Sequence, residues 1–88
     1  MQIAFAPFKA IANTRKHGVT FEEAATALLD EQALVLEDEC EGEHRWIVLG
    51  MSARARLLVV VYALPDEETI RLISARRATR TEAGAYEN

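Results

Sequence analysis

The second half of this sequence is a run of strand-like segments with no room between them for helices. Four segments, at residues 33–38, 44–50, 56–64 and 69–77, are rich in aliphatic residues and are separated by short polar turns. Parallel neighbours need crossover connections of a dozen or more residues. The sequence therefore predicts an antiparallel sheet, in which the nearly continuous apolar segment 56–64 is a central strand covered on both faces.

The beginning of the chain predicts two helices that meet at a short junction. Residues 1–6 read as a short edge strand, and Pro7 suits the first turn of a helix that ends at Gly18. Thr20 then has the character of an N-cap, with Glu23 in position to complete a capping box. The segment "RKHGVTFEEA" is therefore first of all a junction between two helices.

A last short helix is expected at the end of the sequence, because Thr79 and Glu82 form another capping-box pattern. The resulting order, βααββββα, predicts an α+β fold with an antiparallel sheet, two N-terminal helices and a short C-terminal helix. We expect the helices to lie largely on one side of the sheet. Eighty-eight residues, half of them hydrophobic, predict a single domain over residues 1–88.

The net charge of −4 is unevenly distributed along the chain. Residues 30–43 hold acidic side chains and no cation, whereas every basic residue after Lys16 is an arginine. Arginine suits bidentate contacts with phosphate, although a solvated charged surface explains the same pattern. The charge alone therefore leaves nucleic-acid binding open.

Strand alternation predicts which of these side chains share a face. Arg45 is expected on the same face as Leu49, with Trp46 on the opposite face. In the last strand the same rule groups four residues on one face: Ile70, Leu72, Ser74 and Arg76.

Arginines beside apolar strand residues are costly to bury without a partner. Arg45, Arg56 and Arg76 are therefore expected at the rim of the sheet, in ion pairs, or lining a cleft; surface salt bridges are the plainest of these interpretations. An aromatic residue such as Trp46 is more often part of a core than a platform for a stacked base. His17 has the chemistry of an acid or base, but helix capping already explains its place.

The sequence holds no glycine-rich phosphate loop, no dinucleotide fingerprint and no HExxH motif. His17 and His44 lie far apart without nearby ligands, so neither a metal nor a cofactor is expected. The single cysteine, Cys40, excludes an internal disulfide and fits a reducing compartment. No signal peptide and no membrane-spanning run is evident, so we expect a cytoplasmic protein without a membrane partner.

Several motifs together resemble one family. They are "K-x-x-x-N-x-x-K-H-G-V-T-F-E-E-A" from Lys9 to Ala24, "E-x-R-W-I-x-x-G" from Glu43 to Gly50, "LLVVVY", and "IRLISARRAT-x-x-E-x-x-x-Y" from Ile70. Over nearly the whole chain, in order and with compatible gaps, the sequence is similar to the BrnT toxins. These are small bacterial type II toxins related to RelE.

The resemblance implies a RelE-like fold and an endoribonuclease that cleaves RNA without a metal and arrests growth. It also implies a BrnA-like ribbon-helix-helix antitoxin, in a hetero-oligomer, 2:2 in one arrangement, that binds operator DNA through the antitoxin. The sequence departs from the family at residues 5–7, where the family usually reads W-D-P or W-D-x, and in a less basic final helix. An attenuated toxin with weaker RNA affinity would follow from these departures.

Within this hypothesis, cleavage is attack of a ribose 2′-OH on the adjacent phosphate, which needs a base, an acid and cations. Arg45 and Arg76 are the candidate transition-state stabilisers, and Glu43 is either the base or the group that orients Arg45. Trp46 completes the expected catalytic set, either stacking on a base or supporting the arginines. The candidate RNA-binding residues are Arg56, Lys16, His17 and Arg77.

Two other functions fit the same residues. One is an inactive RelE-like module that binds an antitoxin and represses transcription only as part of that complex. The other is a structural oligomer, which leaves the arginines unexplained. We expect Glu43, Arg45 and Arg76 to converge in one cleft if the enzyme hypothesis is right.

Overall fold

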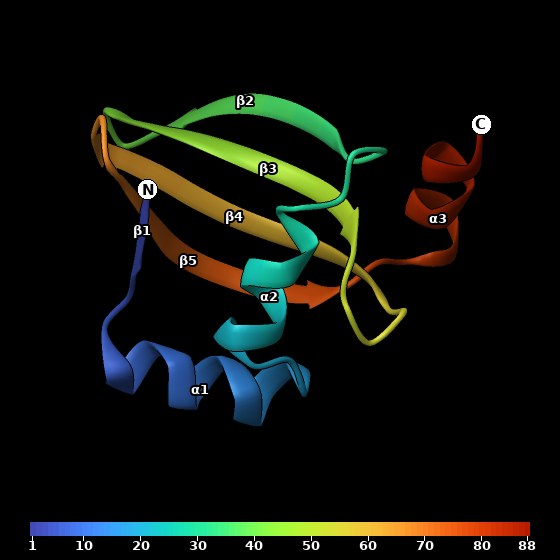
Figure 1. Ribbon diagram of the computed structural model, residues 1–88, viewed down its shortest axis with the longest axis horizontal. Coiled ribbons are helices and arrows are strands. Elements are labelled where there is room, and N and C mark those ends of the chain that lie inside the picture. Colours follow the sequence, from blue (N-terminus) through green and yellow to red (C-terminus); the bar gives the residue numbers. More distant parts are fainter.

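The computed structural model describes all 88 residues as a five-stranded sheet with three helices (Figure 1). Along the sheet the strands follow the order β1-β5-β4-β3-β2. The bounds of the elements, in chain order, are β1 (Gln2–Ala4), α1 (Pro7–His17), α2 (Phe21–Ala27), β2 (Leu34–Cys40), β3 (Glu43–Met51), β4 (Leu57–Asp66), β5 (Thr69–Arg77) and α3 (Arg80–Glu87).

The strands β2 to β5 form the expected antiparallel meander, but the sheet as a whole is mixed. β1 pairs in parallel with β5, with Ile3 opposite Ile70. The parallel direction of this edge strand was not predicted. The chain between β1 and β5 contains most of the domain, so the length that a parallel connection needs is available there.

β4 is the central strand and is buried on both faces, as its apolar sequence predicts. Leu58 and Val60 belong to the main core, whereas Val59 and Ala63 are buried on the opposite face. We call the face of Leu58 and Val60 the helical face, because α2 covers it, and the other the open face.

The main core lies between the helical face and the α1–α2 segment. Its buried members are Val19, Phe21, Ala24, Ala27, Leu58, Val60, Leu72 and Ala75.

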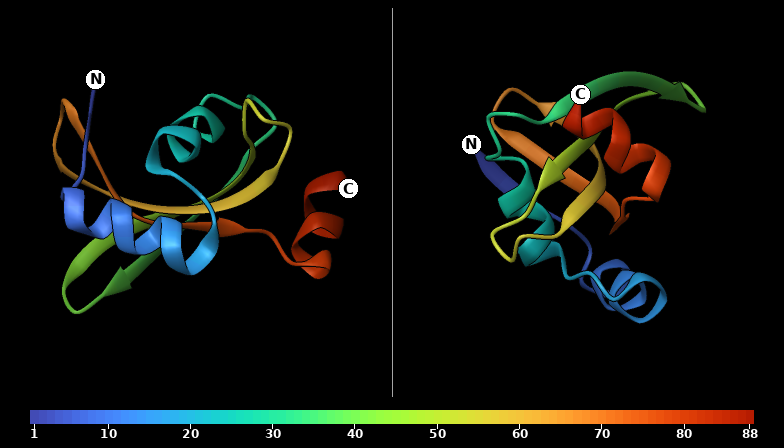
Figure 2. Two further views of the ribbon diagram at one scale, coloured as in Figure 1. Left: turned by 90° about the horizontal axis from the view of Figure 1, so that it is seen from below. Right: turned by 90° about the vertical axis from the view of Figure 1, so that its right-hand side faces the viewer.

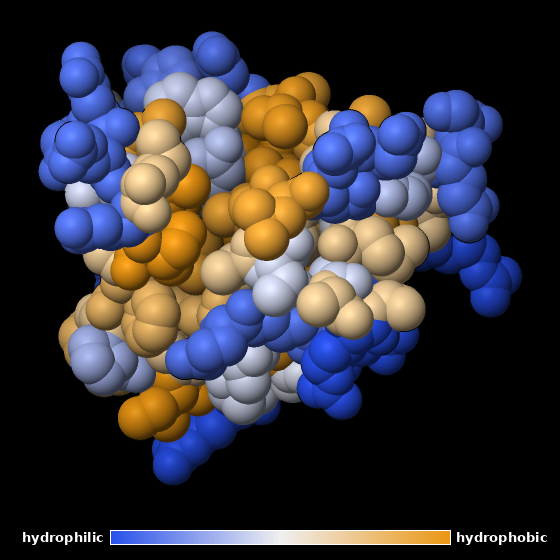
Figure 3. Space-filling model, in the orientation of Figure 1, coloured by the Kyte–Doolittle hydropathy of each residue, from blue (hydrophilic) through white to orange (hydrophobic).

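Figure 2 shows α2 on one side of the sheet, α1 along the β5 edge and α3 at the far end, so the helices do not share one side as expected. In Figure 3 hydrophobic residues gather around the centre of the helical face, between hydrophilic margins. None of the helices is long and apolar enough to cross a membrane.

The junction between α1 and α2 follows from local chemistry. Gly18 ends α1 in the left-handed conformation, with φ of 69°, and its N–H donates to the carbonyl of Thr14. Thr20 caps α2 by accepting from the backbone N–H of Glu23 at 3.0 Å. The Glu23 side chain does not return the bond, so the capping box is only half formed. At the other end of α1 the N-cap is Ala6, which supplies no side-chain cap.

α1 is fixed to the edge of the sheet by one buried asparagine. β1 pairs with β5 no further along than Arg71, so the rest of that edge has no neighbouring strand. The Asn13 amide donates to the carbonyl of Ala75 at 2.8 Å and accepts from its N–H at 3.1 Å. The same amide donates to the carbonyl of Val19 at 2.9 Å. A single side chain thus provides hydrogen-bond partners for the backbone of Ala75 at the strand edge and holds the helix junction against that edge.

A bulge in β5 sets which side chains reach the open face. Val61 pairs with Ser74 but Tyr62 pairs with Leu72, so Ile73 is an extra residue in β5. The expectation that Leu72 and Ser74 share a face was therefore wrong, because the bulge reverses the alternation between them. Leu72 is buried in the core, whereas Ser74 follows the register of the open face.

β3 and α2 approach each other closely at Gly50. A Cβ atom at this position would lie 2.6 Å from the carbonyl oxygen of Ala27. Glycine is therefore required here by space rather than by backbone conformation.

Candidate functional site

A carboxylate held between two arginines lies on the open face of the sheet. Arg45 on β3 and Arg71 on β5 both stand opposite Ala63 of β4, which places them on the same face. The Nε atom of Arg45 donates to Glu43 Oε1 at 3.1 Å, and Arg71 donates to Oε2 of the same residue. All three side chains are partly exposed to solvent.

The cluster combines an ionised carboxylate with two directed guanidinium groups. Hydrogen bonds from Arg71 first and Arg45 second lower the pKa of Glu43, so its carboxylate is ionised at neutral pH. The ion pairs join two guanidinium groups to one carboxylate, and Asp38 on β2 stands opposite Arg45 without an ion pair to it. A carboxylate with a lowered pKa is a weak base, which favours an orienting role for Glu43 over proton abstraction. The arrangement is suited to hold a phosphate beside two directed donors.

Arg76 does not join this cluster. It stands opposite Val59, whereas Arg71 stands opposite Ala63, nearer the other end of β4. Its guanidinium makes two parallel bonds of 2.8 Å to the carboxylate of Glu82 on α3. The pair raises the pKa of Arg76 and lowers that of Glu82 to about 2. The expected convergence of Glu43, Arg45 and Arg76 is therefore absent: the first two meet, and Arg76 instead ties α3 to β5.

Arg56 has a structural partner. It donates from Nε to Oε2 of Glu23 at 2.9 Å, pairs with the other carboxylate oxygen, and reaches the carbonyl of Gly18 at 3.1 Å. Ser52 donates to the same carboxylate at 2.7 Å. Glu23 is buried, and chiefly the hydrogen bond from Arg56 lowers its pKa to about 2. This network joins α2 to the β3–β4 loop, and it occupies the Arg56 guanidinium that we had expected to contact RNA.

Trp46 lies on the helical face, opposite the arginine cluster. Its ring stacks on Tyr62 with centroids 5.9 Å apart and an angle of 13° between the planes, and it also contacts His44. The expected separation of Trp46 from Arg45 is confirmed. Trp46 therefore does not support the arginines directly.

The remaining expected RNA-binding residues lie around the C-terminal end of α1 and the end of β5. Lys16 and His17 line a cleft between α1 and β5. Arg77 is exposed and lies two residues beyond Ala75, which Asn13 anchors. None of these three takes part in an ion pair.

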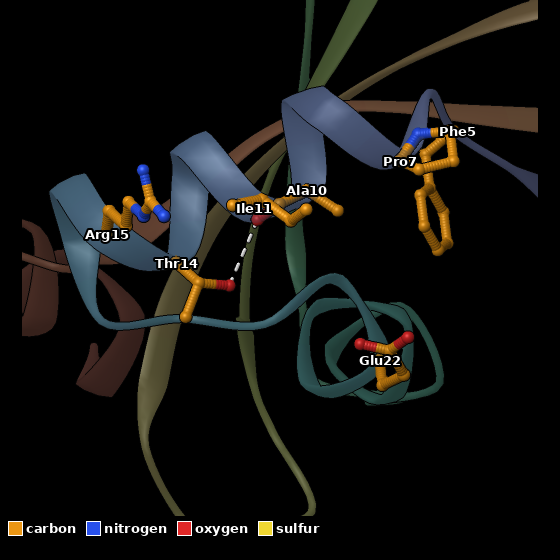
Figure 4. Close-up of a pocket in the computed structure, with 7 residues that line it drawn as sticks. All are labelled: Phe5, Pro7, Ala10, Ile11, Thr14, Arg15 and Glu22. Atoms are coloured by element: carbon orange, nitrogen blue, oxygen red, sulfur yellow. Dashed lines mark hydrogen bonds between the residues drawn. The ribbon is translucent and has the colours of Figure 1, made fainter.

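Two further hollows have a different character. A cavity of about 390 Å³ lies on the open face beside α3 and is mostly apolar; its lining is Leu34, Val35, Leu36, Ile47, Leu49, Val59, Glu82 and Ala85. A second, of about 500 Å³, lies between α1 and α2 and includes Thr14, Arg15 and Glu22 (Figure 4). No three His, Cys, Asp or Glu side chains gather in a way that could hold a metal ion.

Sequence reasoning missed Arg71 as a member of the site. Strand alternation alone would separate Arg71 from Arg76, which is an odd number of residues away. Because Ile73 is an extra residue between them, Arg71 and Arg76 both lie on the open face. The alternating pattern of 69–77, which is less regular than in the other strands, was the one signal of such a bulge.

The fold and this charged sheet face define a small α+β domain of the RelE-like class. Residues 5–82 match the family model of BrnT, described as a ribonuclease toxin of a type II toxin-antitoxin system. The chain therefore belongs to the BrnT family.

A solved structure supports the same fold. The chain is similar to the 1.1 Å crystal structure of the Brucella abortus ribonuclease toxin BrnT, with a TM-score of 0.73 and 23% sequence identity. The match covers 91% of this chain and 99% of the Brucella chain. No match was found among curated proteins.

Proposed function

We propose that this protein is a cytoplasmic endoribonuclease that cleaves RNA without a metal and inhibits translation and growth. The observation that carries the proposal is the pair of partly exposed arginines, Arg45 and Arg71, that Glu43 directs on the open face. Membership of a ribonuclease toxin family supports the class of reaction.

In this proposal the ribose 2′-hydroxyl gives up its proton to water as its oxygen attacks the adjacent phosphorus, and the bond to the 5′-oxygen breaks. The products are a 2′,3′-cyclic phosphate and a 5′-hydroxyl, which takes up a proton. Arg45 and Arg71 stabilise the negative charge that develops on the phosphoryl oxygens. Glu43 orients both arginines, and Arg76 remains the candidate for a further cation.

The test is single-turnover cleavage of a labelled RNA by Arg71→Ala and Arg45→Ala. Loss of one directed cation should slow the chemical step by roughly 10²–10³-fold, by analogy with an oxyanion donor. Arg54→Ala is the matched control, because Arg54 is an exposed arginine in the β3–β4 loop. A wild-type rate in both variants, with normal thermal melting, would remove the cluster from the mechanism. A wild-type protein that binds an antitoxin and cuts no RNA would support the inactive module.

We also propose that a BrnA-like ribbon-helix-helix antitoxin neutralises the toxin, in a 2:2 complex that binds operator DNA through the antitoxin. The uncovered apolar groove beside α3 supports a protein partner, because Leu36 in its wall is 68% exposed. Co-expression should relieve growth arrest, and Leu36→Glu should abolish that relief. Leu64→Glu, an exposed leucine outside the groove, is the control. Light scattering of the purified complex measures its stoichiometry.

A further inference from the structure

Half of the basic side chains have no acidic partner. The protein has ten Lys and Arg residues, and its ion pairs use five arginines. Both lysines, Lys9 and Lys16, are among the others, and both lie on α1. These cations remain without a carboxylate although acidic side chains are in excess, because the net charge is −4.

The two lysines line one cleft between α1 and β5. The cleft has a volume of about 230 Å³, and no carboxylate lines it; its lining is Lys9, Ala12, Asn13, Lys16, His17, Ile73 and Ser74. The α1 members recur every three or four residues and so share one side of the helix. Asn13 fixes that side against Ala75 of β5, so the cleft is a built feature of the fold.

The bulge at Ile73 connects this cleft to the open face. It directs Ser74 away from the core, and Arg71 precedes Ser74 by three residues on the same strand. At the rise of an extended strand, three residues span roughly 10 Å. The cleft therefore lies beside the Glu43 cluster, on the β5 edge of the sheet.

We propose that Lys9, Lys16 and Ser74, with His17 beside them, bind a phosphate of the RNA backbone next to the one that is cleaved. Lysine supplies a point charge and serine a hydroxyl donor, which are both common contacts to nucleic-acid phosphates. The subsite positions the RNA along β5 and takes no part in bond breaking. It rests on the proposed ribonuclease function and adds the path of the substrate.

The experiment is equilibrium binding of a fluorescent single-stranded RNA whose 2′-hydroxyls are methylated, so that it cannot be cleaved. Binding of wild type and of Lys9→Gln/Lys16→Gln is measured by anisotropy over a range of salt concentrations. Each phosphate contact to a single strand contributes about 0.7 to the slope of log K against log salt concentration. Because the two lysines contact the same phosphate, the double variant should bind more weakly and lower that slope by about 0.7.

Arg15→Gln is the matched control. Arg15 is on α1 next to Lys16 but lines the cavity between α1 and α2, as Figure 4 shows. This variant removes a cation from the same helix and should leave the slope unchanged. Thermal melting of all variants establishes that they are folded.

An unchanged slope in the double variant would overturn the subsite, and so would an equal loss of slope in Arg15→Gln. Single-turnover cleavage separates this outcome from failure of the proposed function. The double variant should cleave at the wild-type rate at saturating RNA but need a higher RNA concentration. Absence of cleavage by wild type contradicts the ribonuclease proposal alone, since the binding measurement does not require cleavage.

Discussion

The side-chain amide of Asn13 takes the place of a neighbouring strand beside Ala75. It both donates to and accepts from the backbone of this one residue, as a paired strand would. Since Asn13 also bonds to Val19, the edge of the sheet and the start of α2 depend on the same group.

Asn13→Asp should destabilise the protein although it preserves the shape of the side chain. Both amide donors are lost, and the carboxylate meets two buried carbonyl oxygens. The free energy of unfolding should fall by roughly 2–4 kcal/mol, as expected for buried groups left without partners. Urea denaturation measures this fall. Thr14→Ala is the control, because Thr14 lies on the exposed side of α1, and it should change the free energy of unfolding by no more than about 0.5 kcal/mol. An Asn13→Asp protein as stable as wild type would contradict the role given to Asn13.

Acid should weaken the fold through Glu23. The pKa of this carboxyl is about 2 in the folded protein, well below its ordinary value of 4.5. The stability that it contributes is therefore complete above pH 4.5 and is lost as the pH falls through 2. The shift corresponds to roughly 3 kcal/mol.

The test for Glu23 is urea denaturation between pH 7 and pH 2. Glu23→Gln should be less stable at pH 7 and should lose less stability on acidification. The pH dependence of Glu82→Gln is the comparison. Glu82 also pairs with an arginine, but that arginine, Arg76, is 41% exposed, so solvent screens the ion pair. A Glu23→Gln variant that follows the wild-type pH dependence would show that the acid sensitivity arises elsewhere.

The role of Arg76 can be separated from that of Glu82. If Arg76 acts on RNA, Arg76→Ala should slow single-turnover cleavage by roughly 10²-fold, whereas Glu82→Gln should not. If the pair only holds α3 in place, both variants should slow cleavage to a similar extent and increase amide hydrogen exchange in residues 80–87. Equal cleavage rates in Arg76→Ala and wild type would exclude Arg76 from the reaction.

Gly50→Ala should destabilise the contact between β3 and α2. The new methyl group would overlap the carbonyl oxygen of Ala27, which belongs to the backbone and cannot rotate away. We expect a loss of about 1–3 kcal/mol, typical of overpacking. Gly84→Ala is the matched control, since no atom lies within 4 Å of a Cβ placed there, and alanine favours a helix. A Gly50→Ala protein as stable as wild type would mean that α2 can shift at little cost.

The parts of the fold that depend on neighbours in sequence were predictable. Gly18, Thr20 and Thr79 act through groups within a few residues of themselves, and all three cap helices as expected. The meander from β2 to β5 follows from the shortness of its turns. The family resemblance added the class of reaction, which no residue pattern specified.

The site was less predictable, because its geometry depends on strand register. Arg45 and Arg71 meet through Ala63 on a third strand, and the extra residue at Ile73 decides which face Arg71 takes. The edge strand at the start of the chain was predicted, but its pairing with β5 covers too few residues for the sequence to show that it is parallel. Glu23 had a local explanation as part of a capping box, which concealed its bond to Arg56 more than thirty residues away.

The position of Trp46 makes the protein its own optical probe. It is the only tryptophan, and it stacks on Tyr62 on the face that α2 covers. The arginine cluster lies on the opposite face of the same sheet. Intrinsic fluorescence should therefore change when the sheet melts but respond little when RNA occupies the open face, so unfolding and binding can be followed in one sample by independent signals.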